Sequence, residues 1–153
     1  MNDEKGCVAN VAISLGIIAG IIFVMYSVYF TRIIRGNPQQ FEKQLLTSLA
    51  DWLVQKGAAS KRQAWMMLFI SAALEIAYFL LVFLVITNPV MLLLTTMLVG
   101  LELYHLIRVS WGFYRFFAGK AVLGDIFNWY IERMSAVLFF THTLFVIIIL
   151  LFF

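Results

Sequence analysis

The stretch that decides the fold is residues 64–111, AWMMLFISAALEIAYFLLVFLVITNPVMLLLTTMLVGLELYHLIRVSW. Two apolar runs, 64–86 and 90–116, lie on either side of the short polar break TNP at 87–89. Each run reaches the length of about 20 helical residues that crosses a hydrocarbon core of about 30 Å. The stretch therefore predicts two membrane-spanning helices joined by a tight turn.

Two further apolar runs, 8–31 and 134–153, lie on either side of this hairpin. The chain is 63% hydrophobic and 12% charged, with a mean hydropathy of +0.96, far from the composition of a soluble domain. We expect an all-α polytopic membrane protein, a bundle of four transmembrane helices forming one membrane domain over 1–153. The first run is too long for the apolar core of a signal peptide, so we expect it to stay attached.

Basic residues gather in two of the predicted loops. The loop 32–63 is rich in Lys and Arg, the loop 118–133 adds Lys120 and Arg133, and the turn at 87–89 is uncharged. The positive-inside rule then places both loops in the cytoplasm and both termini outside a plasma (inner) membrane. These charges orient the spans and face anionic lipid, so the net charge of +3 requires no nucleic-acid partner.

The first basic loop also contains a predicted amphipathic helix at 38–56. Asn37 is a candidate cap, Pro38 suits the first helical position, and Gly57 can end the helix. Glu42 is predicted to lie away from the apolar face. The pattern indicates a membrane-surface helix or a dock for a partner, with a plain cytoplasmic connector as the alternative. The apolar face consists of Phe41, Leu45, Leu49, Trp52 and Leu53.

The first span carries small residues at every fourth position, namely Ala12, Gly16 and Gly20. Such a stripe lets another helix approach closely in lipid. The other helix can belong to the same chain, to a second copy or to another subunit. We therefore expect a homo-oligomer or a subunit of a membrane complex.

Ionisable side chains inside the spans are the candidate functional residues. Glu75 lies 13 residues before Asn88 and Glu102 lies 13 residues after Pro89, so both fall about 20 Å below the turn. His142 is predicted within about one turn of that depth, and His105 lies one turn beyond Glu102. Because such residues in a span usually face the bundle interior, we predict a polar layer. Its members are Glu75, Glu102, His105 and His142, with Tyr78 as a neighbour.

Two carboxylates in a low dielectric do not both stay ionised unless a cation lies between them. The leading hypothesis is a protein that binds or conducts a proton or a divalent metal. Glu75, Glu102, His105 and His142 are the candidate metal ligands, and no catalytic residue is predicted. Glu102 and His105 resemble the Glu-x-x-His pair of di-iron helix bundles, which use two such pairs where this chain has one. The architectural alternative is that Glu75 bonds to Tyr78, Tyr104 or His142 and fixes helix register.

Three other functional classes stay open at this point. His105 and His142 can act as axial ligands of a b-type haem, with the chain as the membrane anchor of a redox complex. The layout of four spans with a large first loop is similar to that of the eicosanoid and glutathione membrane enzymes. Their Glu-Arg-x-x-Asn-x-x-Glu signature is absent from this sequence, so the similarity implies no site residues. A scaffold or assembly subunit without its own chemistry is the last class.

Overall fold

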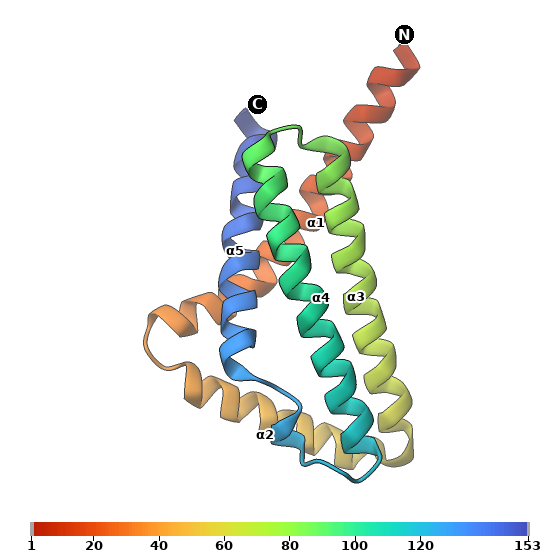
Figure 1. The fold of residues 1–153 in the computed structure, drawn as a ribbon, viewed down its shortest axis with the longest axis vertical. Helices are drawn as coiled ribbons and strands as arrows, with labels where there is room; N and C mark the ends of the chain where they lie inside the picture. Colours follow the sequence, from red (N-terminus) through yellow and green to blue (C-terminus); the bar gives the residue numbers. More distant parts are fainter. Residues whose placement is uncertain (1, 153) are drawn as a thin grey trace.

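The structure, a computed structural model, describes the backbone of residues 2–152 and the side chains of residues 10–152. All regular elements of this part are helices, as Figure 1 shows. Short 3-10 turns lie in two of the connections, Gly57–Ala59 between the second and third long helices and Leu123–Asp125 between the fourth and fifth. The long helices are α1 (Asn2–Ile34), α2 (Pro38–Lys56), α3 (Ser60–Val85), α4 (Pro89–Phe117) and α5 (Trp129–Phe152).

Four stretches are long and apolar enough to cross a membrane. The second stretch includes α2, which carries charged residues along its length, so its apolar part lies in α3. The prediction of an all-α chain with four helices fit to span a bilayer is therefore confirmed. The stretches are Asn10–Ile34, Pro38–Val85, Pro89–Phe117 and Trp129–Phe152.

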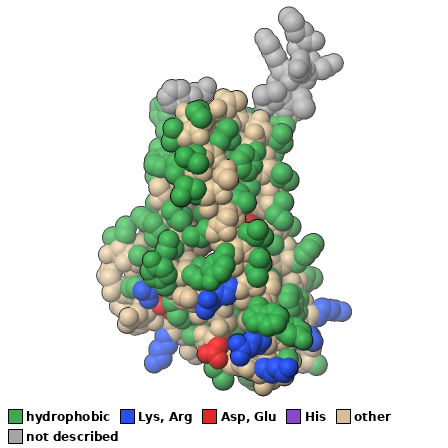
Figure 2. All heavy atoms as spheres, viewed as in Figure 1, with side chains coloured by type: hydrophobic (Ala, Val, Ile, Leu, Met, Phe, Trp, Pro, Cys, Tyr) green, Lys and Arg blue, Asp and Glu red, His purple; other side chains and the backbone are tan. Residues whose placement is uncertain are grey.

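The helices form a bundle in which α1 crosses diagonally and packs chiefly on α5 and α3 (Figure 1). Helix α2 lies across one end of this bundle, and the turn between α3 and α4 lies at the other end. Both ends of the chain are on the side of that turn. The visible Lys and Arg side chains gather at the end where α2 lies, as Figure 2 shows.

Helix α1 enters the core through a face that differs from its small-residue stripe. Leu15 and Ala19 are fully buried and Ile22 is nearly so. A Cβ atom added to Gly16 would lie 3.8 Å from the Leu150 side chain, and one added to Gly20 would meet nothing within 4 Å. The buried residues Leu15, Ala19 and Ile22, which lie beside the stripe, thus form most of the core contact of α1. Ala12, Gly16 and Gly20 are half-buried, and their packing against another chain stays a prediction.

Local caps explain where two helices begin and end. The Asn88 side-chain oxygen accepts hydrogen bonds from the amides of Val90 (3.0 Å) and Met91 (3.2 Å), which starts α4 directly after the turn. Gly57, at φ 51°, ends α2 in the left-handed region. The predicted cap at Asn37 is wrong, because its side chain donates to the Gln40 side chain (2.8 Å) instead of accepting from the helix.

Helix α5 begins at Trp129, earlier than the span predicted at 134–153. The Asn128 side chain accepts a hydrogen bond from the Tyr130 amide (3.1 Å) and so caps the start of α5. The polar residues that follow Asn128 therefore belong to the helix. Upstream, Ile126 packs on α4 at Gly112, where an added Cβ would lie 3.0 Å from the Ile126 backbone. Because α5 already begins at Trp129, Glu132 lies on this helix and not in the loop where it was predicted.

Candidate functional site

The two glutamates of the predicted spans lie near the middle of α3 and α4 and are buried in the bundle. Glu75 is 9% exposed and Glu102 is 2% exposed. The Ser71 hydroxyl donates to Glu75 Oε1 across 3.3 Å. Glu75 Oε2 and Glu102 Oε1 are buried and find no hydrogen-bond partner among the described residues. Two buried acceptors without partners are unusual, because such oxygens normally find a donor in a folded protein.

His105 bridges Glu102 to a third carboxylate, Glu132 of α5. Its Nδ1 lies 3.2 Å from Glu102 Oε2 and its Nε2 lies 2.9 Å from Glu132 Oε1. Each of these hydrogen bonds requires one proton, so two protons hold the three groups together. Glu75 shares no hydrogen bond with these three described residues, and it is grouped with them because it is buried in the same bundle at the same residue count from the turn as Glu102. We call Glu75, Glu102, His105 and Glu132 the inner acidic cluster.

The inner acidic cluster has more acidic than basic groups. It contains three carboxyl groups and a single imidazole, which can carry at most one positive charge. Within residues 10–152, no Lys or Arg forms an ion pair with any member of the cluster. Full ionisation of the carboxyl groups would therefore leave uncompensated negative charge in a low-dielectric interior, which is strongly unfavourable. Additional protons or a bound cation would remove this imbalance.

His142 forms a separate, neutral hydrogen-bonded chain. The Thr95 hydroxyl donates to the Met91 carbonyl (2.7 Å), so it accepts from His142 Nε2 (2.8 Å). His142 Nδ1 is then unprotonated and accepts from the Tyr78 hydroxyl (2.7 Å). Every polar hydrogen in this chain has an acceptor. We call Tyr78, His142 and Thr95 the outer triad, since they lie nearer than Glu102 to the turn between α3 and α4.

The predicted polar layer is thus divided into two parts. Glu102 and His105 are bonded to each other, Glu75 is bonded to Ser71, and Tyr78 and His142 are engaged in the outer triad. Among the described side chains, no group of three or more His, Cys, Asp and Glu residues is arranged to hold a metal ion. His105 and His142 each use both ring nitrogens on protein partners, an arrangement that does not favour haem ligation by the pair.

Three residues of the site were not predicted from the sequence. They are Glu132, Thr95 and Tyr26, which lines the same pocket as Glu75. Glu132 follows the helical spacing of Ser135 and His142, so extending the fourth span toward its amino end would have found it. A threonine or tyrosine in a span carries no comparable signal, because both are frequent in spans without a site role.

A second charged contact joins three helices beside the cluster. Arg133 of α5 donates to both carboxylate oxygens of Glu42 on α2, across 2.6 and 2.8 Å, and the Tyr29 hydroxyl of α1 donates to the same carboxylate across 2.8 Å. The Glu42 side chain is 4% exposed and that of Arg133 is 34% exposed. Glu42 was predicted to lie on the outer polar face of α2, and this is wrong because Arg133 supplies its countercharge within the bundle. We call this contact the α2 clamp.

The α2 clamp holds the pKa of Glu42 below its usual value. The hydrogen bonds from Arg133 make the largest contribution, and the Tyr29 hydroxyl adds to it, while burial opposes both. Glu42 belongs to α2, outside the four apolar helices. An ionised Glu42 is therefore the form that ties α2 to α1 and α5.

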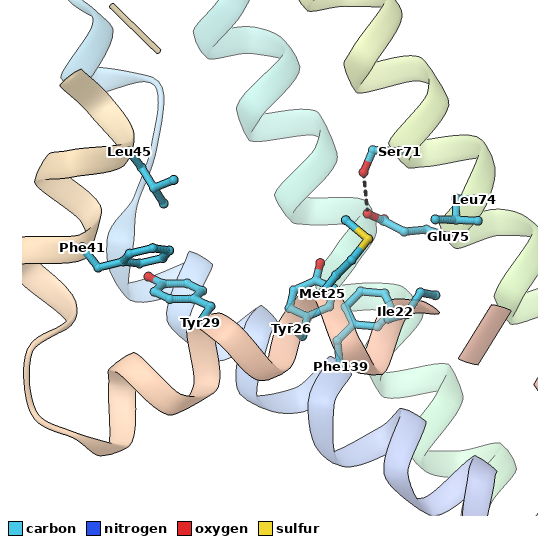
Figure 3. Close-up of a pocket in the computed structure, with 10 residues that line it drawn as sticks. All are labelled: Ile22, Met25, Tyr26, Tyr29, Phe41, Leu45, Ser71, Leu74, Glu75 and Phe139. Atoms are coloured by element: carbon cyan, nitrogen blue, oxygen red, sulfur yellow. Dashed lines mark hydrogen bonds between the residues drawn. The ribbon is translucent and has the colours of Figure 1, made fainter. Parts of the chain in front are cut away.

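A pocket of about 240 Å³ lies between α1, α2 and α3, with Phe139 of α5 at its base. Figure 3 shows Glu75 reaching from α3 toward Met25 and Tyr26 on α1. Tyr29 and Phe41 face each other at the other end of the pocket. Two residues of the predicted apolar face of α2, Phe41 and Leu45, thus line the pocket. The location of α2 on a membrane surface stays a prediction.

The chain matches no protein-family model, no curated protein and no solved structure. What this site does therefore has to follow from its own geometry and charge.

Proposed function

We propose that this chain is a plasma (inner) membrane protein whose inner acidic cluster binds and releases protons. Both termini are outside and the end bearing α2 is cytoplasmic, in keeping with the positive-inside rule. The observation that carries the proposal is the pair of buried carboxylate oxygens without partners, Glu75 Oε2 and Glu102 Oε1. Two such acids, close in a water-poor interior, are stable together only when a proton or another cation neutralises part of their charge.

The composition of the cluster favours a proton as this cation. A carboxyl group can neutralise itself by taking one proton, which requires no coordination shell. A divalent metal would need several oxygen or nitrogen ligands at short distance, and the described side chains do not form such a group. His105, hydrogen-bonded between two carboxyl groups, is suited to pass a proton from one to the other.

The exposure of the cluster favours access from the end where α2 lies. Glu102 is almost fully buried, whereas His105 and Glu132 are 16% and 17% exposed. Toward the other end lie the outer triad, whose hydrogen bonds are satisfied with a neutral His142, and the buried apolar residues Phe139 and Val146. We therefore propose proton binding with access from one side, as in a coupled transport step, in preference to open conduction through the bundle. Assembly of the chain with itself or with other membrane proteins stays a prediction.

Infrared spectroscopy of the full chain in lipid nanodiscs tests this proposal. Spectra recorded in acidic and alkaline buffer should differ by a band from a protonated, buried carboxyl group. Glu75→Gln and Glu102→Gln should each remove part of this difference. Asp125→Asn, which changes an exposed carboxylate in the loop before α5, serves as the matched control and should keep it.

Two outcomes would contradict the proposal. One is a spectrum in which neither Gln variant changes the carboxyl band. The other is a stoichiometric divalent metal in the purified protein that disappears in both Gln variants, which would make the cluster a metal site.

A further inference from the structure

The pocket beside Glu75 combines one acidic end with aromatic and aliphatic walls. Apart from Glu75, its polar lining consists of Ser71 and the two tyrosines Tyr26 and Tyr29. The remaining lining is apolar. No Lys or Arg lines this pocket, so its only charged group is an acid. The Arg32 guanidinium lies 5.8 Å from the centroid of the Phe41 ring at the other end of the pocket, so the end that suits a cation is the one with Glu75.

Aromatic rings line both ends of the pocket, Tyr26 and Phe139 nearer Glu75 and Tyr29 and Phe41 at the other end (Figure 3). Tyr26 stacks on Phe139 with ring centroids 5.1 Å apart, and Tyr29 packs against Phe41 at 5.4 Å. Aromatic faces attract cations, most strongly where water is excluded, and quaternary ammonium groups are bound in this way. The aromatic rings of Tyr26 and Phe139 and the Glu75 carboxyl group, all in the lining of one pocket (Figure 3), therefore form a site for a positive charge with a hydrophobic body.

We infer that the Glu75 pocket binds a hydrophobic organic cation, an alkylated or aromatic amine of about one ring. The pocket volume of about 240 Å³ is below the range of about 300–1,000 Å³ typical of pockets for drug-sized ligands, so the ligand is small. The ammonium group lies against the Glu75 carboxylate and the ring lies among Tyr26, Phe139 and the aliphatic residues. The inference deepens the proposed function, since it names the cation that competes with the proton at Glu75.

The exchange balances in charge. A protonated Glu75 gives up one proton as the organic cation binds, and the carboxylate then pairs with the ammonium group. The total charge inside the membrane is unchanged, so the exchange avoids an uncompensated buried charge. The proton leaves by way of Glu102, His105 and Glu132.

The rim of the pocket suits a ligand that arrives from the membrane. Met25 is 64% exposed and Leu45 is 45% exposed, and both line the opening between α1 and α2. The negative surface potential of the cytoplasmic leaflet concentrates hydrophobic cations next to this region. A neutral lipid chain is the other candidate occupant of this apolar pocket. It would form no ion pair with the Glu75 carboxylate.

A matched pair of probes separates these two occupants. Benzyltrimethylammonium carries a permanent positive charge, and neopentylbenzene has nearly the same shape without the charge. Binding of each to the full chain in nanodiscs is measured by calorimetry and by saturation-transfer NMR. We expect the cation to bind the unmodified protein and the neutral probe to bind more weakly.

Two variants assign the binding to this pocket. Glu75→Gln should weaken binding of the cation about tenfold or more, because it removes the only countercharge. Leu45→Trp, on the exposed rim, should weaken binding by filling the opening while the carboxyl infrared band is retained. Asp125→Asn should bind the cation as the unmodified chain does.

Equal binding of the two probes, or cation binding unaffected by both Glu75→Gln and Leu45→Trp, would overturn the inference. If the carboxyl band titrates through Glu75 but the cation does not bind, the inference fails and the proposed function stands. Cation binding that depends on Glu75 supports the inference. If no proton is released as it binds, the proposed function is the one that fails.

Discussion

The inner acidic cluster and the outer triad have similar groups at neighbouring depths of one bundle, yet their hydrogen bonds differ. In the outer triad each donor has an acceptor, and His142 is neutral. In the inner cluster Glu102 and Glu132 share the His105 imidazole, and one oxygen each of Glu75 and Glu102 lacks a partner among the described residues. A saturated polar contact fixes helix register, whereas an unsaturated one retains the capacity to bind something else. Polarity inside the membrane therefore does not by itself mark a functional site.

The α2 clamp sharpens this comparison, because it is charged and yet both carboxylate oxygens of Glu42 accept hydrogen bonds. Arg133→Ala should leave Glu42 buried without its countercharge and detach α2 from α5. We expect a loss of about 3 kcal/mol in the free energy of unfolding, at the lower end for a broken buried pair because Arg133 is partly exposed. Unfolding in mixed micelles measures the effect, with Lys120→Ala as the control for loss of a nearby positive charge. A change no larger than that of the control would mean that the clamp does not hold α2.

The outer triad should behave as architecture. Thr95→Val leaves the His142 Nε2 hydrogen without an acceptor, and we expect it to lower the free energy of unfolding by about 2 kcal/mol. Thr96→Val is a matched control, because Thr96 makes the same bond to a carbonyl four residues back but is exposed. The same unfolding measurement applies. Equal effects of the two substitutions would show that the triad contributes nothing beyond local helix contacts.

The inner cluster should respond in the opposite direction. Glu75→Gln removes one of the three carboxyl groups from a cluster that has only one imidazole. The free energy of unfolding should therefore stay constant or rise by up to about 1 kcal/mol. At the same time the carboxyl infrared band should diminish. A loss of stability comparable to that of Thr95→Val would place Glu75 with the architectural contacts and erase the contrast between the two regions.

The smallest expected effect is the loss of unfolding free energy when Glu42 becomes protonated, which occurs only in acidic buffer. Because the folded pKa of Glu42 lies below its usual value of 4.5, its contribution is complete above that value and is lost as the pH falls through the folded pKa. The unfolding free energy should therefore decrease in this acidic range. Glu42→Gln should show a shallower decrease when the pH series is repeated. Identical pH profiles would mean that Glu42 does not titrate with folding.

Counting residues from the turn at 87–89 predicted that Glu75 and Glu102 share one depth, and both side chains are buried in the bundle. The count depends on two helices that are joined by a tight turn and rise at the same rate. It does not extend to Glu132, because the start of α5 depends on the Asn128 cap, which apolar length does not reveal. It also does not identify the partners of His142, because these depend on the rotation of three helices about their axes.

Composition and apolar length by themselves determined an all-α chain with four helices fit to cross a membrane. The physical reason is that a backbone in lipid must satisfy its hydrogen bonds within its own helix, so the information is local. Which polar groups meet was decided only by the tertiary structure. Pairing of Glu42 with Arg133, of His105 with Glu132 and of His142 with Thr95 depends on how helices distant in the sequence pack, and no local pattern encodes that packing.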